Sequence, residues 1–351
     1  MGLAALLVLG LMTAQSGGQD PDEQRWTALT RAGDSLRPPA QIGRANNAAG
    51  AYLRAWDSLP FSELRALGAA AAEVSDLKTL TPERRELLSR HSSYIDVLIA
   101  ASATPDCDWG VAFEQGWEVL LPHLGQMRQT ARILRADAVR CVSEGSMIAA
   151  VERVRAMLRV SVHAAENAVL ISTLVGIAIA AQATDTAQVL LDSGKMTPAQ
   201  ARILLAGFSE VPRRDFYSAA AAVENERRVT LRWLPEKCGG EDAGMDFARL
   251  LGGLQIDGID LFSPTHRLNE QQFMEHLARA DRYYQMLSDA WLRDDGGARL
   301  EELELELREF QHGLVAMSMA PSMGRARRSV LDLQARFSKM EARLEALAGQ
   351  E

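Results

Sequence analysis

Hydrophobic side chains recur at alternating intervals of three and four residues along most of the chain, which is the period of an amphipathic α-helix. Two of these stretches open on a threonine followed by a proline, at Thr81-Pro82 and Thr197-Pro198. A threonine side chain caps the free N–H groups of a helix start, and proline fits the first helical position because its missing N–H costs nothing there. The sequence therefore predicts helices that begin at Pro82 and Pro198, the first of them running to about Ala101.

A glycine separates two helical patterns within Gln129–Val162. Ala131 and Ala138 stand before Gly145, and Ala150 follows it. Small side chains let two antiparallel helices approach closely, and glycine permits the tight turn between them. The segment resembles one tetratricopeptide-like hairpin. No second copy follows at the period of about 34 residues that such repeats have, so a regular solenoid is not predicted.

Between these two regions the pattern is interrupted twice. Ser102–Gly110 is polar and rich in turn-forming residues, which predicts a loop. Helix is expected to resume at Val111, to be kinked or interrupted at Pro122, and to continue to about Glu144.

The segment Asn167–Thr184 carries no charged residue. A helix that is apolar on all sides is either the central helix of a bundle or a membrane span. Ser172, Thr173 and Gln182 lie within the segment, and no Lys or Arg flanks it closely. These features favour a core helix and no stable membrane span.

Three apolar seams follow one another near the C-terminus: Phe273 to Trp291, Leu300 to Met317, and Met323 to Leu347. Narrow seams favour near-parallel, coiled-coil-type packing, and short breaks between helices force antiparallel neighbours. We therefore expect an antiparallel three-helix bundle over residues 269–348. The last seam is the longest, so Phe337–Leu347 is expected to offer surplus apolar surface. It either packs within the chain or makes residues 323–347 the contact of a homodimer.

The composition changes after residue 234. Residues 235–268 are rich in glycine, with Gly239-Gly240 and Gly252-Gly253, and predict a linker or a docked irregular segment. The chain is accordingly divided into a helical domain at residues 20–234, this segment, and the bundle at residues 269–348.

The N-terminus has the features of an export signal. Gly2–Met12 is apolar and is followed by Ala14 and Ser16, whose small side chains suit a signal peptidase. Residues 1–16 are predicted to be a signal peptide, and the mature chain to be periplasmic or secreted. No Lys or Arg precedes the apolar run, so the alternative is an N-terminal helix docked on the core.

The composition sets the class of protein. The chain has 351 residues, with 38 Lys+Arg against 46 Asp+Glu, 47% hydrophobic residues and only 6% aromatic ones. The acidic balance argues against a nucleic-acid partner. Abundant Ala, Leu and Arg with few β-branched and aromatic runs predict an all-α fold, a multi-helix array. Cys107, Cys141 and Cys238 form no C-x-x-C motif, and either a Cys107–Cys141 disulfide or free thiols fit the spacing.

The sequence offers little catalytic chemistry. No motif for nucleophilic catalysis, phosphate binding or metal binding is present, so no catalytic, cofactor-binding or metal-binding residue and no cofactor is predicted. His163 and Glu166 share a helical face as metal ligands do, but no matching pair stands on another helix. Carboxylates at Asp106, Asp108, Glu114 and Glu118 surround Trp109 and Trp117 near a loop. They mark a sugar or peptide groove, or they cap a helix.

Several short stretches resemble a group of uncharacterised, secreted helical proteins from environmental bacteria: Asn46-Asn47-Ala48-Ala49, Cys107-Asp108-Trp109, Leu120-Leu121-Pro122-His123-Leu124 and Leu170-Ile171-Ser172. The similarity covers about residues 46–234 and implies an exported all-helical protein with tetratricopeptide-like hairpins and no known activity. We expect a non-catalytic scaffold or protein-binding module with a protein or peptide partner. The alternative is a cell-envelope hydrolase or lytic enzyme that uses Asp108, Glu114 and Glu118.

Overall fold

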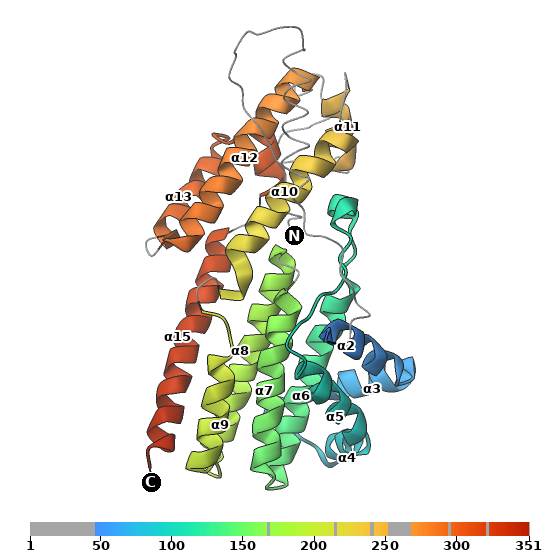
Figure 1. Ribbon diagram of the computed structural model, residues 1–351, viewed down its shortest axis with the longest axis vertical. Coiled ribbons are helices and arrows are strands. Elements are labelled where there is room, and N and C mark those ends of the chain that lie inside the picture. The colour runs from blue at the N-terminus through green and yellow to red at the C-terminus, as the bar shows by residue number, and fades with distance from the viewer. Residues whose placement is uncertain are drawn as a thin grey trace. The chain divides into compact units, whose positions relative to one another are not determined.

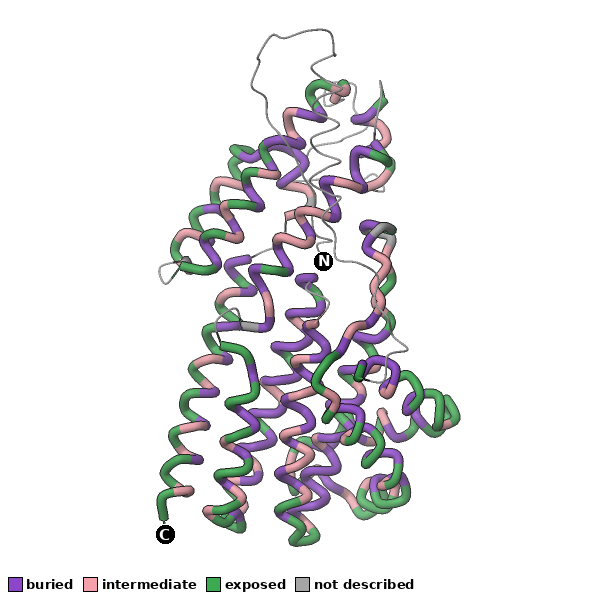
Figure 2. The backbone as a smooth tube through the Cα atoms, viewed as in Figure 1, coloured by how far each residue is buried: buried purple, intermediate pink, exposed green. Residues whose placement is uncertain are grey.

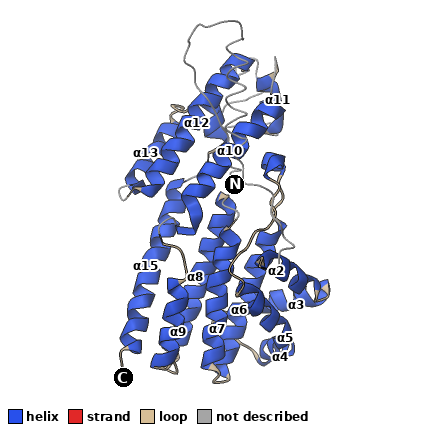
Figure 3. Cartoon of the chain, in the orientation of Figure 1, coloured by secondary structure: helices blue, strands red, loops and turns tan. Residues whose placement is uncertain are grey.

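The computed structural model describes residues 46–166, 169–213, 216–238, 242–251, 268–293, 296–320 and 323–350. Within these ranges the chain forms fourteen α-helices, α2 to α15, and two short 3-10 helices, with no strand (Figure 3). The predicted all-α fold is confirmed. The predicted signal peptide at residues 1–16 and its alternative, a docked N-terminal helix, lie outside the described residues.

The described chain divides into two compact units, which are treated separately. The first, called here the α6–α9 unit, draws on residues 46–111, 120–218 and 329–350. Its helices are α2 (Ala48–Asp57), α3 (Phe61–Ala72), α4 (Pro82–Arg90), α5 (Ser92–Ser102), α6 (Pro122–Ser143), α7 (Met147–Ala165), α8 (Leu170–Asp192), α9 (Pro198–Ser209) and most of α15 (Met323–Ala348).

Local capping explains where several helices of this unit begin. The Thr81 hydroxyl accepts a hydrogen bond from the backbone N–H of Arg84, and Thr197 forms a reciprocal capping box with Gln200. Both predicted helix starts are confirmed, but the first helix ends at Arg90 and a separate helix, α5, follows from Ser92 where one helix to about Ala101 was expected. Pro122 occupies the first position of α6, so the expected interruption is also there. Upstream of it, only the short 3-10 helix η1 (Phe113–Glu118) forms where a longer helix from Val111 was expected.

The centre of the unit is the set α6, α7 and α8, which run side by side (Figure 1). Gly145 makes the turn between α6 and α7 with a φ of 79°. Residues buried from solvent are concentrated along α6, α7 and α8 (Figure 2). At Gly176 the backbones of α7 and α8 approach so closely that a Cβ would lie 2.6 Å from the Ser161 carbonyl oxygen. The tetratricopeptide-like character of the α6–α7 pair stays a prediction.

Helix α8 contains residues 170–184 of the uncharged segment and continues through Asp185 to Asp192. Of the described residues, it alone is long and apolar enough to cross a membrane, and just over half (56%) of its apolar window is buried by the protein itself. Among its buried residues are Ser172, Thr173, Thr184 and Thr186. A core helix has these features too. The absence of a stable membrane span stays a prediction.

A charged side chain is buried within this core. The carboxylate of Asp137 on α6 is fully buried and receives hydrogen bonds from Arg140 at 2.6 Å and from Arg153 on α7 at 2.9 Å. Burial lowers the pKa of both guanidinium groups, but the hydrogen bonds that they donate to Asp137, together with its negative charge, outweigh it and the net shift is upward. The two arginines compensate the buried charge and tie α6 to α7.

The last helix contributes its residues from 329 onward to the same unit. Phe337 of α15 is fully buried and packs edge-on against Phe208 of α9, with ring centroids 4.9 Å apart. Ion pairs flank this contact, from Arg213 to Glu341 at 2.6 Å and from Arg343 to Asp192 at 2.9 Å. Within one chain, therefore, α15 already has an apolar partner. The homodimer through residues 323–347 stays a prediction.

The second unit, called here the α10–α14 unit, draws on residues 112–119 and 219–328. It holds η1, α10 (Ala219–Lys237), α11 (Ala243–Leu250), α12 (Glu270–Leu292), α13 (Gly296–Arg308), α14 (Gly313–Met319) and the start of α15. Arg227 of α10 pairs with Asp281 of α12 at 2.5 Å. Phe247 of α11 packs near Phe273 of α12, with centroids 5.7 Å apart.

The structure of this part of the chain differs from the predicted division into a linker and a three-helix bundle. The second apolar seam belongs to two helices, α13 and α14, because a turn with Phe310 at a φ of 61° separates them. Part of the segment predicted as a linker is helical, as α10 reaches Lys237 and α11 covers Ala243–Leu250, while residues 252–267 lie outside the described part. The three-helix bundle over residues 269–348 is therefore not confirmed.

Candidate functional site

A loop at residues 103–111 of the α6–α9 unit is hydrogen-bonded to the start of α2. Asn47 caps α2, and its side-chain amide also bonds both the C=O and the N–H of Asp108 at 2.8 Å. The N–H of Ala48 donates to the Asp106 carbonyl at 2.7 Å, and the Asn46 amide to the Asp106 carboxylate at 2.8 Å. One asparagine thus satisfies a helix start and a loop together.

A stack of aromatic rings joins this loop to α2 and α6. Trp109 is parallel to Trp56 with centroids 5.6 Å apart, and it stacks on His123 at 4.6 Å. Tyr52 stacks on both tryptophans. The indole N–H of Trp56 donates to Thr130, and that of Trp109 to the backbone carbonyl of His163. Buried rings with satisfied N–H groups make this a rigid wall.

His163 of α7 lies next to this stack, with its ring edge-on to that of Tyr52. The Tyr52 hydroxyl lies 3.0 Å from its Nδ1. Burial raises the pKa of Tyr52, so the phenol stays protonated, and it donates to Nδ1 in the tautomer that carries its proton on Nε2. Burial lowers the pKa of His163 to about 4, the charge of Arg159 acts in the same direction, and a hydrogen bond with the Thr104 backbone opposes them. The ring is neutral near pH 7.

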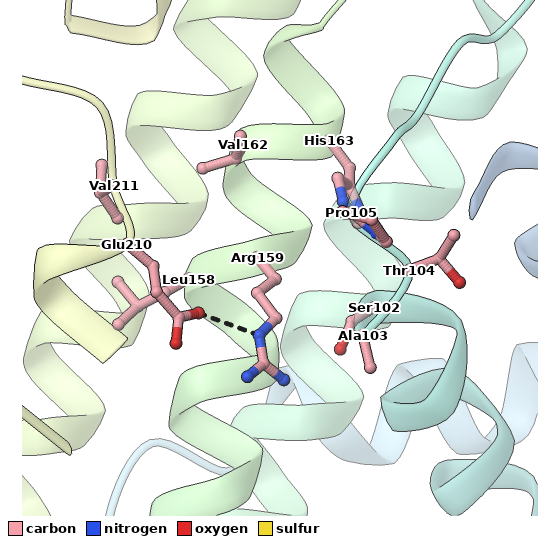
Figure 4. Close-up of a pocket in the computed structure, with 10 residues that line it drawn as sticks. All are labelled: Ser102, Ala103, Thr104, Pro105, Leu158, Arg159, Val162, His163, Glu210 and Val211. Atoms are coloured by element: carbon pink, nitrogen blue, oxygen red, sulfur yellow. Dashed lines mark hydrogen bonds and ion pairs between the residues drawn. The ribbon is translucent and has the colours of Figure 1, made fainter. Parts of the chain in front are cut away.

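In front of His163 the structure has a cleft of about 380 Å³ between α7, the end of α9 and the loop after α5 (Figure 4). Its lining residues are Ser102, Ala103, Thr104, Pro105, Leu158, Arg159, Val162, His163, Glu210 and Val211. Most of this surface is apolar. The Ser102 hydroxyl donates to the Ile99 carbonyl at 2.7 Å and is thereby engaged within α5.

One end of the cleft is bounded by a closed ring of ion pairs. Arg155 contacts Glu152 at 3.3 Å and Glu210 at 2.7 Å, and Arg159 contacts the same two carboxylates at 3.3 and 3.1 Å. Burial raises the pKa of Glu210, but the two arginines outweigh it and the net shift is downward. The ring carries no net charge, and it joins α7 to the end of α9. Figure 4 shows the Arg159 guanidinium beside Glu210.

The structure brings together some of the residues that the sequence singled out. Asp106, Asp108, Trp109 and His163 all belong to this neighbourhood. The side chains of Glu114, Trp117 and Glu118 lie outside the described part of the structure. No cluster of three potential metal ligands occurs among the residues described, around His163 and Glu166 or elsewhere.

The cysteines form no part of the cleft chemistry. All three are buried and free, so the Cys107–Cys141 disulfide is not present. Burial raises the pKa of each thiol, to about 11 for Cys141 and about 12 for Cys238. Thiols that stay protonated near pH 7 are poor nucleophiles.

The sequence interpretation missed the ion-pair ring. Glu152, Arg155 and Arg159 lie at intervals of three and four residues, which places them on one face of α7. That spacing was a usable signal. The fourth member, Glu210, follows α9 and reaches the ring only through the packing of α9 on α7.

No family model, curated protein or solved structure matches this chain. The resemblance to secreted helical bacterial proteins stays a prediction. Four residues of the stretches that carry this resemblance lie in one cluster of the structure: Asn47, Asp108, Trp109 and His123.

Proposed function

We propose that this chain is an exported helical scaffold or protein-binding module that acts in the periplasm or cell envelope without catalysing a reaction. The observation that carries the proposal is the cleft in front of His163. Two of its polar side chains have side-chain partners: Arg159 pairs with Glu210, and His163 bonds Tyr52, which lies outside the lining. The accessible surface of the cleft is an apolar wall beside an arginine. This composition is typical of recognition sites.

The reactive groups of the cleft support binding over catalysis. His163 is neutral near pH 7 and its Nδ1 accepts from Tyr52, so that nitrogen is already occupied. Ser102 donates to a backbone carbonyl rather than to a base. A nucleophile and a base within reach of each other, which acyl transfer needs, are not paired in this cleft.

The rival function is a cell-envelope hydrolase centred on Asp108, Glu114 and Glu118. Asp108 lies in the loop fastened by Asn47, and its carboxylate receives the Gly110 N–H at 3.4 Å. This is a loop-stabilising contact. No contact among the described side chains favours the rival.

Site-directed photo-crosslinking in the native host tests the binding function. A photo-reactive residue at Ala103, exposed on the cleft rim, should form a discrete adduct with one envelope protein. The matched control is Ser89, exposed on α4 of the same unit. The captured protein, once purified, should bind the wild-type chain in calorimetry. An identical adduct pattern at both positions, or no binding by the purified protein, would contradict the proposal.

An activity assay tests the rival function, a cell-envelope hydrolase. Purified wild-type chain is incubated with envelope polymers, beside the Asp108→Asn variant and its neighbour Asp106→Asn. We expect no hydrolysis by any of the three. Hydrolysis that Asp108→Asn abolishes and Asp106→Asn retains would establish the enzyme instead. Export itself is tested by sequencing the N-terminus of protein from the native host, which should begin near Gly17.

A further inference from the structure

The ion-pair ring beside the cleft has more hydrogen-bond donors than acceptors. Each of the four carboxylate oxygens of Glu152 and Glu210 accepts from one guanidinium nitrogen. A guanidinium group carries five N–H bonds. Arg155 and Arg159 each direct only two nitrogens at these carboxylates, and Nε of Arg155 is buried with no partner among the described residues.

The surplus matters at Arg159, because this arginine lines the cleft and Arg155 does not. Nε of Arg159 bonds Glu210 and Nη1 bonds Glu152. Its Nη2 has no hydrogen bond within the part of the chain that the structure describes, and the side chain keeps 21% of its exposure. One edge of the guanidinium is thus available to an acceptor that enters the cleft.

Most of the remaining surface of the cleft is apolar. Leu158, Val162 and Val211 lie on the side of α7 and α9, and Ala103 and Pro105 lie on the loop opposite. A volume of about 380 Å³ falls within the usual range for small-ligand sites. His163 adds a neutral ring, so Arg159 is the only cationic group among the lining residues.

We propose that this cleft binds a carboxylate carried on an apolar body, with the carboxylate on the free edge of Arg159 and the apolar part against Val162, Ala103 and Pro105. A monoanion suits the ring, since the ring is already neutral and one guanidinium edge matches one carboxylate. A cation would face Arg159. A phosphate dianion would bring a second charge that no lining group compensates.

This inference rests on the proposed function, because it names the chemistry by which a partner enters the cleft. Two sources carry that chemistry: the C-terminus of a peptide that ends in an apolar residue, and a free apolar acid. Both sources have an apolar body beside the carboxylate, so the experiment compares a peptide C-terminus with a free apolar acid directly.

Calorimetry on the full chain uses four probes: N-acetyl-leucine, N-acetyl-leucinamide, an N-acetylated hexapeptide ending in leucine with a free carboxylate, and the same peptide as its amide. We expect each free acid to bind at least tenfold more tightly than its amide. A peptide acid that exceeds N-acetyl-leucine identifies a peptide end as the source and supports both proposals. Equal affinity of the two acids supports the carboxylate site and contradicts the protein-binding function.

Equal binding of acid and amide, or no binding of any probe, overturns the carboxylate site while the crosslinking result at Ala103 still decides the protein-binding function. Two variants test the assigned contact. Arg159→Met should lower the affinity for the peptide acid at least tenfold, whereas Arg65→Met, which removes the same charge from the surface of α3 in the same unit, should leave it unchanged.

Glu210→Gln guards against loss of folding as the explanation. It removes the negative charge that competes for Arg159, so the peptide acid should bind severalfold more tightly. A gain of affinity cannot come from a misfolded protein. Weaker binding by Glu210→Gln, with an unchanged melting temperature, overturns the assignment of Arg159 as the carboxylate contact.

Discussion

Tyr52 and His163 are 111 positions apart in the chain, and their side chains meet in the core, with the Tyr52 hydroxyl 3.0 Å from Nδ1 of the histidine. This hydrogen bond joins α2 to α7 and orients the imidazole at the back of the cleft, while burial keeps the ring neutral near pH 7. Its contribution is measurable because the unit also holds a buried tyrosine without such a bond. The hydroxyl of Tyr94 on α5 has no partner among the described residues.

The two tyrosines make a matched pair of variants. Tyr52→Phe leaves Nδ1 of His163 buried without a donor, so we expect the free energy of unfolding to fall by about 1–3 kcal/mol. Tyr94→Phe removes a hydroxyl that is already unsatisfied and should be neutral or slightly stabilising. Chemical denaturation measures both. Equal effects of the two substitutions would show that the Tyr52–His163 bond does not contribute to stability.

Acid should destabilise the α6–α9 unit through two histidines. Burial lowers the pKa of His123 and of His163 to about 4, below the ordinary value of 6.5. Between these values the unfolded chain binds a proton at each histidine and the folded chain does not, so stability falls as the pH decreases. Each histidine contributes a slope of about 1.4 kcal/mol per pH unit in that window.

The slope is measured by denaturant titration between pH 6 and pH 5, above the range in which most carboxylates titrate. His163→Gln should reduce it by about 1.4 kcal/mol per pH unit, and so should His123→Gln. A slope that neither substitution changes would contradict the neutral state assigned to these rings.

The features that the sequence predicted well are local. The helix starts at Pro82 and Pro198 depend on a cap and a first turn, which lie within four residues of each other. Glu210 pairs with Arg159 although the two residues lie 51 positions apart in the sequence. The spacing of charged residues along α7 therefore could not predict Glu210 as the partner of Arg159. The same holds for Phe337, whose seam was visible, although periodicity does not say which helix covers it.

Two glycines of the unit should respond to alanine in opposite directions. A Cβ at Gly176 would lie 2.6 Å from the Ser161 carbonyl oxygen, so Gly176→Ala forces α8 away from α7 and should cost about 1–3 kcal/mol. Gly125 on α6 has open space around it, and Gly125→Ala should stabilise by about 0.5–1 kcal/mol through helix propensity. Thermal unfolding compares them. A stabilising Gly176→Ala would show that the two helices are not in close contact.

The buried carboxylate of Asp137 should be essential to the core. Asp137→Asn leaves Arg140 and Arg153 without their shared anion, and we expect a loss of about 3–5 kcal/mol. Asp96 pairs with Arg153 from the surface, where its side chain is 64% exposed, so Asp96→Asn should cost less than about 1 kcal/mol. Urea titration of both variants provides the measurement. Similar losses would mean that burial does not distinguish the two pairs.

Residues 329–348 of α15 should be held by the chain's own α9 and not by a second copy. Phe337 is fully buried against Phe208, whereas Leu331 on the same helix is 45% exposed. Phe337→Asp places a charge in that contact and should lower the melting temperature by many degrees, while Leu331→Asp should change it little. Sedimentation velocity should give the same oligomeric state for wild type and both variants, because the Phe337 contact is internal. A wild-type dimer that Phe337→Asp converts to a folded monomer would instead make this helix the association surface, and the homodimer through residues 323–347 would replace internal packing.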